Sequence, residues 1–148
     1  MSLQDRLAQE IKAAMLARDA DRLGALRMLK SAAGYVQIEK KIESLPDAEF
    51  VVLAQKEVKK RRDSIEQFEK GGRPELAAKE RAEVLVLEAF LPQPFSNDEL
   101  EQLVRATIQE TGATSKKDMG AVIKAVQAKA AGRADGKSIS TAVGKLLP

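Results

Sequence analysis

The side chains that most often carry out chemistry in proteins set the first limit on the function of this sequence. The chain has 148 residues and contains no cysteine and no histidine. Cysteine–histidine and serine–histidine–aspartate triads, histidine acid–base steps and the usual zinc ligand sets are therefore excluded. Disulfides are excluded as well. Paired carboxylates, or a lysine with an altered pKa, remain as candidate catalytic groups.

The carboxylates in the most charged part of the chain do not have the pattern of a catalytic pair. Each stands four residues from a basic side chain, which is typical of a solvent-exposed helix surface with salt bridges. The pairs are Glu57 with Arg61, Lys59 with Asp63, and Arg62 with Glu66. We therefore expect no catalytic residue, no metal ion and no cofactor.

These charged residues belong to a segment, residues 50–73, whose apolar residues recur at helical spacing. The apolar positions are Val51, Ala54, Val58, Ile65 and Phe68. Arg61 occupies the middle of this stripe, where an apolar residue is expected. A buried arginine needs a partner of opposite charge.

A partner for Arg61 is expected in the next helix. The glycines at 71 and 72 and the proline at 74 predict a short turn and a new helix, hence an antiparallel hairpin. Folding the hairpin there places Arg61 opposite Glu83 and within about one turn of Glu80. One interpretation is a structural ion pair of Arg61 with Glu83 or Glu80, and the other is an anion site formed by Arg61 and Arg62. Arginine keeps its proton, so we expect no acid–base role.

The rest of the pattern predicts an all-α protein with four helices followed by three. Hydrophobic residues make up 44% and charged residues 32% of the chain, and no strand-like alternation occurs, which fits a soluble helical protein. The second helix, about residues 22–43, is apolar on two sides, so we expect it to be packed on both. Two prolines at 92 and 94 predict a linker between an N-terminal module, 1–91, and a C-terminal module, 96–148. No signal peptide or membrane-spanning run is present, so we expect a cytoplasmic protein without membrane contact.

Positive charge gathers at the end of the chain. Residues 112–148 carry seven basic and two acidic side chains, a net charge of +5, whereas residues 92–111 carry −3. The candidate RNA-binding cations are Lys116, Lys117, Lys124, Lys129, Arg133 and Lys137. Backbone amides after Ser115 could help to hold a phosphate. Stacking aromatics are almost absent, so contact with the backbone of folded RNA is favoured over reading of bases.

A second basic patch is expected on the helix described first, and it consists of Lys59, Lys60 and Arg62. For both basic regions, a lysine-rich surface that binds nothing is the alternative.

Several short stretches, taken together and in order, resemble the YqeY-like family over essentially the whole chain. They are ARDADRL at 17–23, LRMLKSA at 26–32, QKEVKKRR at 55–62, AFLP at 89–92, MGAV at 119–122 and GRADG at 132–136. That family is similar to the C-terminal tail domain of the B subunit of the glutamine-dependent aspartyl/glutamyl-tRNA amidotransferase. The tail is a helical appendage that binds tRNA and does not carry the transamidation chemistry.

The resemblance implies the same four-plus-three helical layout. It also implies that Met119, Gly120, Lys124 and the turn at 132–136 are the positions shared most closely with the tail. The chain lacks the catalytic body of the amidotransferase and its amidase partner. A proline in the loop at 45–47, where a serine cap is expected, is a further departure from the family's pattern.

From these observations we expect a non-catalytic module that binds tRNA through the basic C-terminal end. One alternative is an accessory to an amidotransferase, that is, to a carbon–nitrogen ligase with glutamine as amido donor. The other alternative is a protein–protein adaptor that uses its helical faces.

Overall fold

The computed structural model describes all residues, 1–148, and it contains α-helices, one short 3-10 helix and no strand. The prediction of an all-α protein is confirmed. The chain divides into two compact units, a first unit Met1–Leu91 and a second unit Pro92–Pro148. Each unit has its own hydrophobic core. None of the helices is long and apolar enough to span a membrane.

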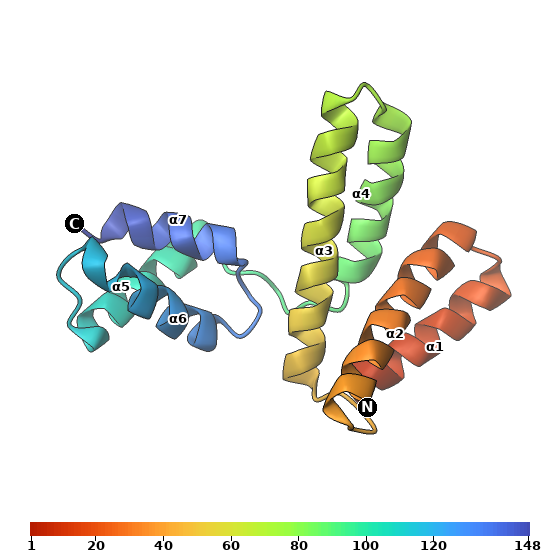
Figure 1. The fold of residues 1–148 in the computed structure, drawn as a ribbon, viewed down its shortest axis with the longest axis horizontal. Coiled ribbons are helices and arrows are strands. Elements are labelled where there is room, and N and C mark those ends of the chain that lie inside the picture. Colours follow the sequence, from red (N-terminus) through yellow and green to blue (C-terminus); the bar gives the residue numbers. More distant parts are fainter. The chain divides into compact units, whose positions relative to one another are not determined.

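The first unit consists of two helical hairpins (Figure 1). The first hairpin is α1 (Leu3–Ala17) with α2 (Ala20–Lys40), and the second is α3 (Asp47–Lys70) with α4 (Pro74–Glu88). The core lies where the hairpins meet, and its largest buried side chains include Leu26, Leu29 and Phe50. The rings of Phe50 and Phe90 lie 5.8 Å apart, at the distance of an aromatic pair.

Local sequence signals fix the ends of these helices. Ser2 and Asp5 form a capping box at the start of α1. The turn between α3 and α4 contains Gly72 with a φ of +70°, a conformation that favours glycine. Pro74 is the first residue of α4, where its missing N–H costs no hydrogen bond. The turn therefore forms the short hairpin that brings α4 back along α3.

The prediction that α2 is packed on both of its apolar sides is wrong. One side, with Leu26, Leu29 and Ala33, is fully buried. On the other side Met28, Tyr35 and Ile38 are 55%, 76% and 79% exposed. The reason is that α2 packs on α1 and α4, whereas α3 packs mainly against α4 and leaves that side of α2 uncovered.

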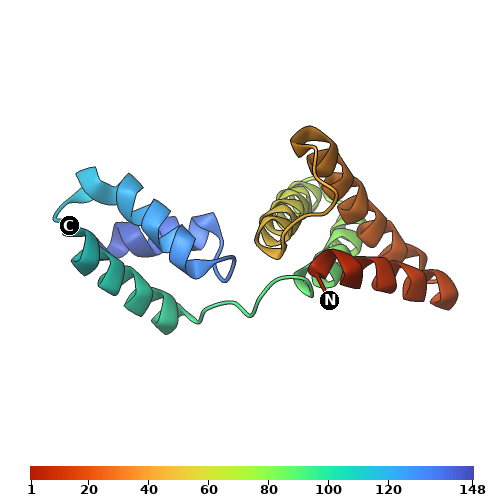
Figure 2. The same ribbon diagram turned by 90° about the horizontal axis from the view of Figure 1, so that it is seen from below.

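The second unit contains α5 (Asn97–Thr111), the 3-10 helix η1 (Lys116–Asp118), α6 (Met119–Ala130) and α7 (Gly136–Leu146), as Figure 2 also shows. Its core is made of small aliphatic side chains such as Val104, Val126 and Val143. Ser96 and Glu99 form a capping box at the start of α5. The backbone N–H of Phe95 donates to the carbonyl of Arg133 at 2.8 Å, so the chain before α5 is tied to the α6–α7 turn.

Candidate functional site

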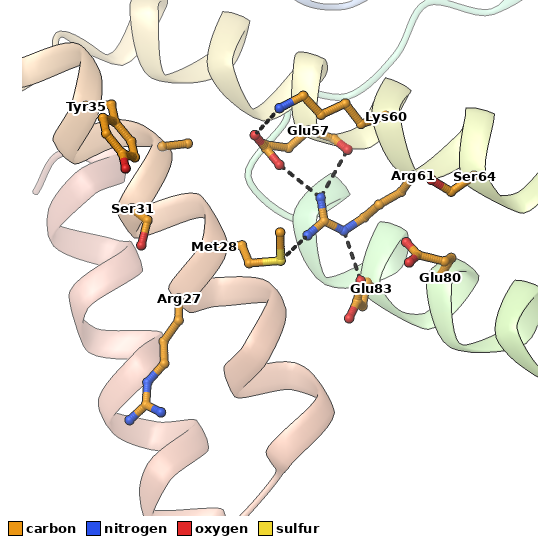
Figure 3. A pocket seen from close by; sticks show the side chains of 11 residues that line it. Arg27, Met28, Ser31, Tyr35, Glu57, Lys60, Arg61, Ser64, Glu80 and Glu83 are labelled. Carbon is orange, nitrogen blue, oxygen red and sulfur yellow. Dashed lines mark hydrogen bonds and ion pairs between the residues drawn. The ribbon is translucent and has the colours of Figure 1, made fainter. Parts of the chain in front are cut away.

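Arg61 is the centre of a buried polar cluster in the first unit (Figure 3). Its Nε donates to Glu83 Oε2 at 3.1 Å, across the hairpin from α3 to α4. Its Nη1 donates to Glu57 Oε2 at 3.0 Å, one turn earlier on α3. Its Nη2 lies 3.2 Å from Met28 Sδ on α2. One guanidinium therefore joins three helices.

Glu57 was not expected in this cluster. The spacing of Glu57 and Arg61 was interpreted as an exposed salt bridge, but the two side chains are only 7% and 5% exposed. Burial follows because Glu57 shares one side of α3 with Ala54, three residues before it, and Arg61, four residues after it, and both of these are buried. The preference of a buried carboxylate for a buried arginine could have identified it in the sequence.

Glu80 is the second carboxylate expected near Arg61, and no ion pair joins the two side chains directly. Burial raises the pKa of Glu80, and the neighbouring carboxylate of Glu83 raises it further, against the opposing effect of Arg61. The structure thus brings Arg61 together with Glu83 and Glu57, with Glu80 beside them in a place that disfavours its negative charge.

The cluster forms the floor of an open hollow of about 480 Å³. The walls come from α2, α3 and α4, with Arg27, Ser31, Ala32 and Tyr35 on the α2 side. Arg61 uses its Nε and Nη1 donors on Glu83 and Glu57, and its Nη2 contacts Met28 Sδ, so one N–H on Nη2 is left for an anion site with Arg62. Arg62 itself donates to Glu88 Oε1 at 2.6 Å.

The three cations of the second basic patch are all exposed, but they differ in their partners. Lys59 is exposed and makes no ion pair, whereas Lys60 Nζ lies 3.4 Å from the buried Glu57. Arg62 reaches the other way, to Glu88 on α4. Lys59 and Arg62 are three residues apart and lie on the same side of α3, whereas Lys60 is turned about 100° from Lys59.

The six cations of the second unit fall into two groups. Lys116, Lys117, Lys124 and Lys137 are exposed and make no ion pair within the chain. Lys129 is paired with Glu110. Arg133 donates to the carbonyl of Gln93 at 2.9 Å and lies 3.9 Å from the centre of the Phe95 ring, which gives it a structural role beside the linker.

The backbone amides after Ser115 are already hydrogen-bonded. Lys116 N donates to Pro148 O at 3.0 Å, and Asp118 N donates to Ser115 O at 3.0 Å. Lys117 N donates to Ser115 Oγ at 3.4 Å. The first turn is a 3-10 helix rather than the start of α6, and this geometry turns its amides to partners within the unit. A phosphate at this place would have to be held by side chains.

No group of three acidic side chains that could hold a metal ion is present. The fold and the two polar regions define a two-unit, all-α protein with a buried arginine–carboxylate cluster in one unit and exposed lysines in the other.

Comparison with known proteins assigns this class to a family. A family model described as Yqey-like protein matches residues 4–147, and the chain belongs to this family. An uncharacterized protein of Schizosaccharomyces pombe is 31% identical over 96 residues, which are 65% of this chain and 77% of the relative.

Two further relatives bear the name altered inheritance of mitochondria protein 41, mitochondrial. The one from Eremothecium gossypii is 32% identical over 85 residues, or 57% of this chain and 46% of the relative. The one from Saccharomyces cerevisiae is 30% identical over 115 residues, or 75% of this chain and 62% of the relative. The chain thus spans less than two thirds of each of these two relatives.

Proposed function

We propose that the second unit binds the phosphate backbone of folded RNA, and of tRNA in particular, without catalysing a reaction. The observation that carries this proposal is the set of four exposed lysines that make no ion pair, namely Lys116, Lys117, Lys124 and Lys137. Unpaired cations can exchange their counterions for phosphates without first breaking a contact in the protein.

The side chains on the surface between Lys117 and Lys124 are small. Gly120 and Ala121 are exposed in the first turn of α6, between Lys117 of η1 and Lys124 of α6, and these two small residues share one side of α6 with Lys124. A Cβ at Gly120 would have no atom within 4 Å. Small side chains between cations let a nucleic-acid backbone approach closely, and contacts of this kind position an RNA without reading its sequence.

The proposal also assigns different roles to the two units. They would act as separate modules, and only the second would bind RNA. The cytoplasmic location stays a prediction from the sequence. The resemblance to the amidotransferase tail supports tRNA as the RNA that is bound. The same resemblance implies the alternative, which is an accessory role beside a glutamine-dependent ligase.

The test is the salt dependence of tRNA binding, measured by fluorescence anisotropy. If four lysines contact phosphates, the logarithm of the affinity should fall against the logarithm of the salt concentration with a slope of roughly −3 to −4. Lys124→Gln should reduce the size of the slope by about 1 for every tRNA tried. Lys129→Gln is the matched control on the same helix, and it should change the slope less because Lys129 is already paired with Glu110.

Three outcomes would contradict the proposal. A salt-independent signal would exclude phosphate contacts as its source. A larger loss from Lys59→Glu than from Lys117→Glu would move the site to the first unit. Glutamine-dependent amide formation in the presence of the chain and a charged tRNA would favour the accessory role instead.

A further inference from the structure

Met28 joins helix α2 to the buried cluster of Arg61 through its sulfur atom (Figure 3). Arg61 Nη2 lies 3.2 Å from Met28 Sδ, and this contact is the one hydrogen bond between the cluster and α2. A thioether sulfur is a weak acceptor, whereas the guanidinium is a charged donor that keeps its proton. One N–H on Nη2 also has no acceptor. A stronger acceptor at the position of the sulfur would therefore find a donor ready to bind it.

The side chain of Met28 can be reached from solvent, although the guanidinium that it contacts is buried. Met28 is 55% exposed, whereas the side chain of Arg61 is only 5% exposed. Met28 also lines the open hollow of about 480 Å³ above the cluster, which has room for a small oxidant and for one added oxygen atom. Methionine has a flexible, unbranched side chain, so an oxygen bonded to Sδ can turn toward Nη2 without a movement of α2.

We propose that Met28 is a site of reversible oxidation by hydrogen peroxide, and that the oxygen of its sulfoxide replaces Sδ as the acceptor of the Arg61 guanidinium. In this step the O–O bond of the peroxide breaks, one oxygen atom forms the S=O bond, the sulfur loses two electrons, and water is released. A sulfoxide oxygen accepts hydrogen bonds much more strongly than a thioether does, and a bond from a charged donor is among the stronger ones. Reductases that act on methionine sulfoxide restore the thioether.

The contact with Arg61 distinguishes Met28 from a second methionine that is equally exposed. Oxidation of a methionine usually weakens a fold, because a polar group replaces an apolar one. Met15, near the end of α1, is 53% exposed, and no donor bonds its sulfur, so its oxidation should create no new contact. At Met28 the added oxygen meets a buried cation with a free N–H. Oxidation of Met28 should therefore hold α2 more firmly to the α3–α4 hairpin.

Two variants of the full chain isolate the effect of each sulfur. Met15→Leu keeps Met28, Met28→Leu keeps Met15, and both variants retain Met1 and Met119. Each variant is treated with hydrogen peroxide, and thermal unfolding is followed through the fluorescence of Tyr35, which is the single tyrosine and lies on α2. Peptide mass mapping of the wild type gives the two rates of oxidation. They should agree within about threefold, because the two methionines are similarly exposed.

Oxidation should shift the melting temperature of Met15→Leu upward by about 2–4 °C relative to its effect on Met28→Leu. A methionine sulfoxide reductase should remove this difference. The NMR signals of the Arg61 N–H groups should shift when Met28 is oxidised and not when Met15 is. Met28→Gln supplies an oxygen acceptor without any oxidant, so it should be more stable than Met28→Leu, whereas Met15→Gln should gain nothing over Met15→Leu.

Arg61→Lys is the control for the donor. Its ammonium cannot reach Glu57, Glu83 and the sulfoxide at once, so the gain from oxidation of Met28 should fall by at least roughly half. The proposal would be overturned by an equal or lower melting temperature of oxidised Met15→Leu relative to oxidised Met28→Leu, each compared with its untreated form. It would also be overturned by an undiminished gain in Arg61→Lys, or by a Met28 that stays unmodified while Met15 is fully oxidised.

Discussion

At the scale of single residues, replacing Arg61 tests whether the buried cluster stabilises the fold. Arg61→Ala leaves the buried Glu57 and the partly buried Glu83 without their cation, and the loss of a buried pair costs about 3–5 kcal/mol of unfolding free energy. Lys60→Ala removes a cation whose side chain is 74% exposed and should cost less than about 1 kcal/mol. Urea denaturation of both variants gives the comparison.

Arg61→Lys is a useful intermediate in the same experiment. It keeps the positive charge but cannot reach Glu57, Glu83 and Met28 at once, so its stability should fall between those of wild type and Arg61→Ala. Equal unfolding midpoints for Arg61→Ala and Lys60→Ala would show that the cluster does not stabilise the fold.

Glu80 gives this cluster a dependence on pH. Its pKa is raised in the folded protein, by burial and then by Glu83, so the folded state retains a proton that the unfolded chain has lost. The contribution of Glu80 to stability is therefore present below its unfolded pKa and is lost as pH rises through the higher folded value. Glu80→Gln removes the ionisation, and at neutral pH it should raise the melting temperature by on the order of 1 °C.

The gain from Glu80→Gln should shrink as pH falls and vanish at about pH 3, where the carboxyl of the wild type is protonated in both states. Asp63→Asn serves as the control, since it removes the same charge from an exposed position of α3. Thermal unfolding at the two pH values measures both effects. A gain that persists at low pH, or an equal gain from Asp63→Asn, would assign the effect to something other than the ionisation of Glu80.

Among these residues, the sequence could predict Arg61 but not all of its contacts. An arginine in the middle of an apolar stripe, followed by a glycine turn, is enough to predict that its carboxylate partner lies on the returning helix. The choice among Glu57, Glu80 and Glu83 depends on side-chain rotamers and on how far α2 stands from α3. Neither quantity follows from helical periodicity, and so Glu57 was assigned to the surface.

At the scale of helices, periodicity was a good guide to where elements lie and a poor guide to what covers them. The capping box at Ser96 and the proline at 74 mark helix starts that the structure contains. The two apolar sides of α2 look alike in the sequence, yet only one is buried. Burial depends on which helices pack together, and a pattern within one helix does not contain that information.

The start of α6 shows a related limit. Ser115 followed by two lysines has the pattern of a helix start with free amides. In the structure a 3-10 turn precedes α6, and the first amide of that turn, Lys116 N–H, donates to the carbonyl of Pro148. The partner is 32 residues away in the sequence, beyond the reach of a local motif. The side chains of Lys116 and Lys117 are exposed without needing any partner, whereas the partner of the Lys116 amide does not follow from the local sequence.

At the scale of the whole molecule, the segment between the two cores is where a protease of broad specificity should cut first. Phe95 is held on the second unit by its hydrogen bond to Arg133 and by the stacking of the Arg133 guanidinium on its ring. Between the first core, which ends near Leu91, and this attachment stand three residues, Pro92, Gln93 and Pro94, and the last two of them are exposed. We therefore expect the first cut at 91–95, giving two fragments that each keep a core.

Arg133 makes this prediction specific. Arg133→Ala removes both its bond to the carbonyl of Gln93 and its contact with Phe95, so cleavage at 91–95 should become faster. Lys129→Ala, four residues earlier and remote from the linker contacts, should leave the rate unchanged. Limited proteolysis followed by mass spectrometry identifies the sites and their order. The contrary result would be a first cut at the glycines of the α3–α4 turn, with 91–95 intact in both the wild type and Arg133→Ala. It would show that more than the Arg133 contacts protects the linker and that the two units do not separate as modules.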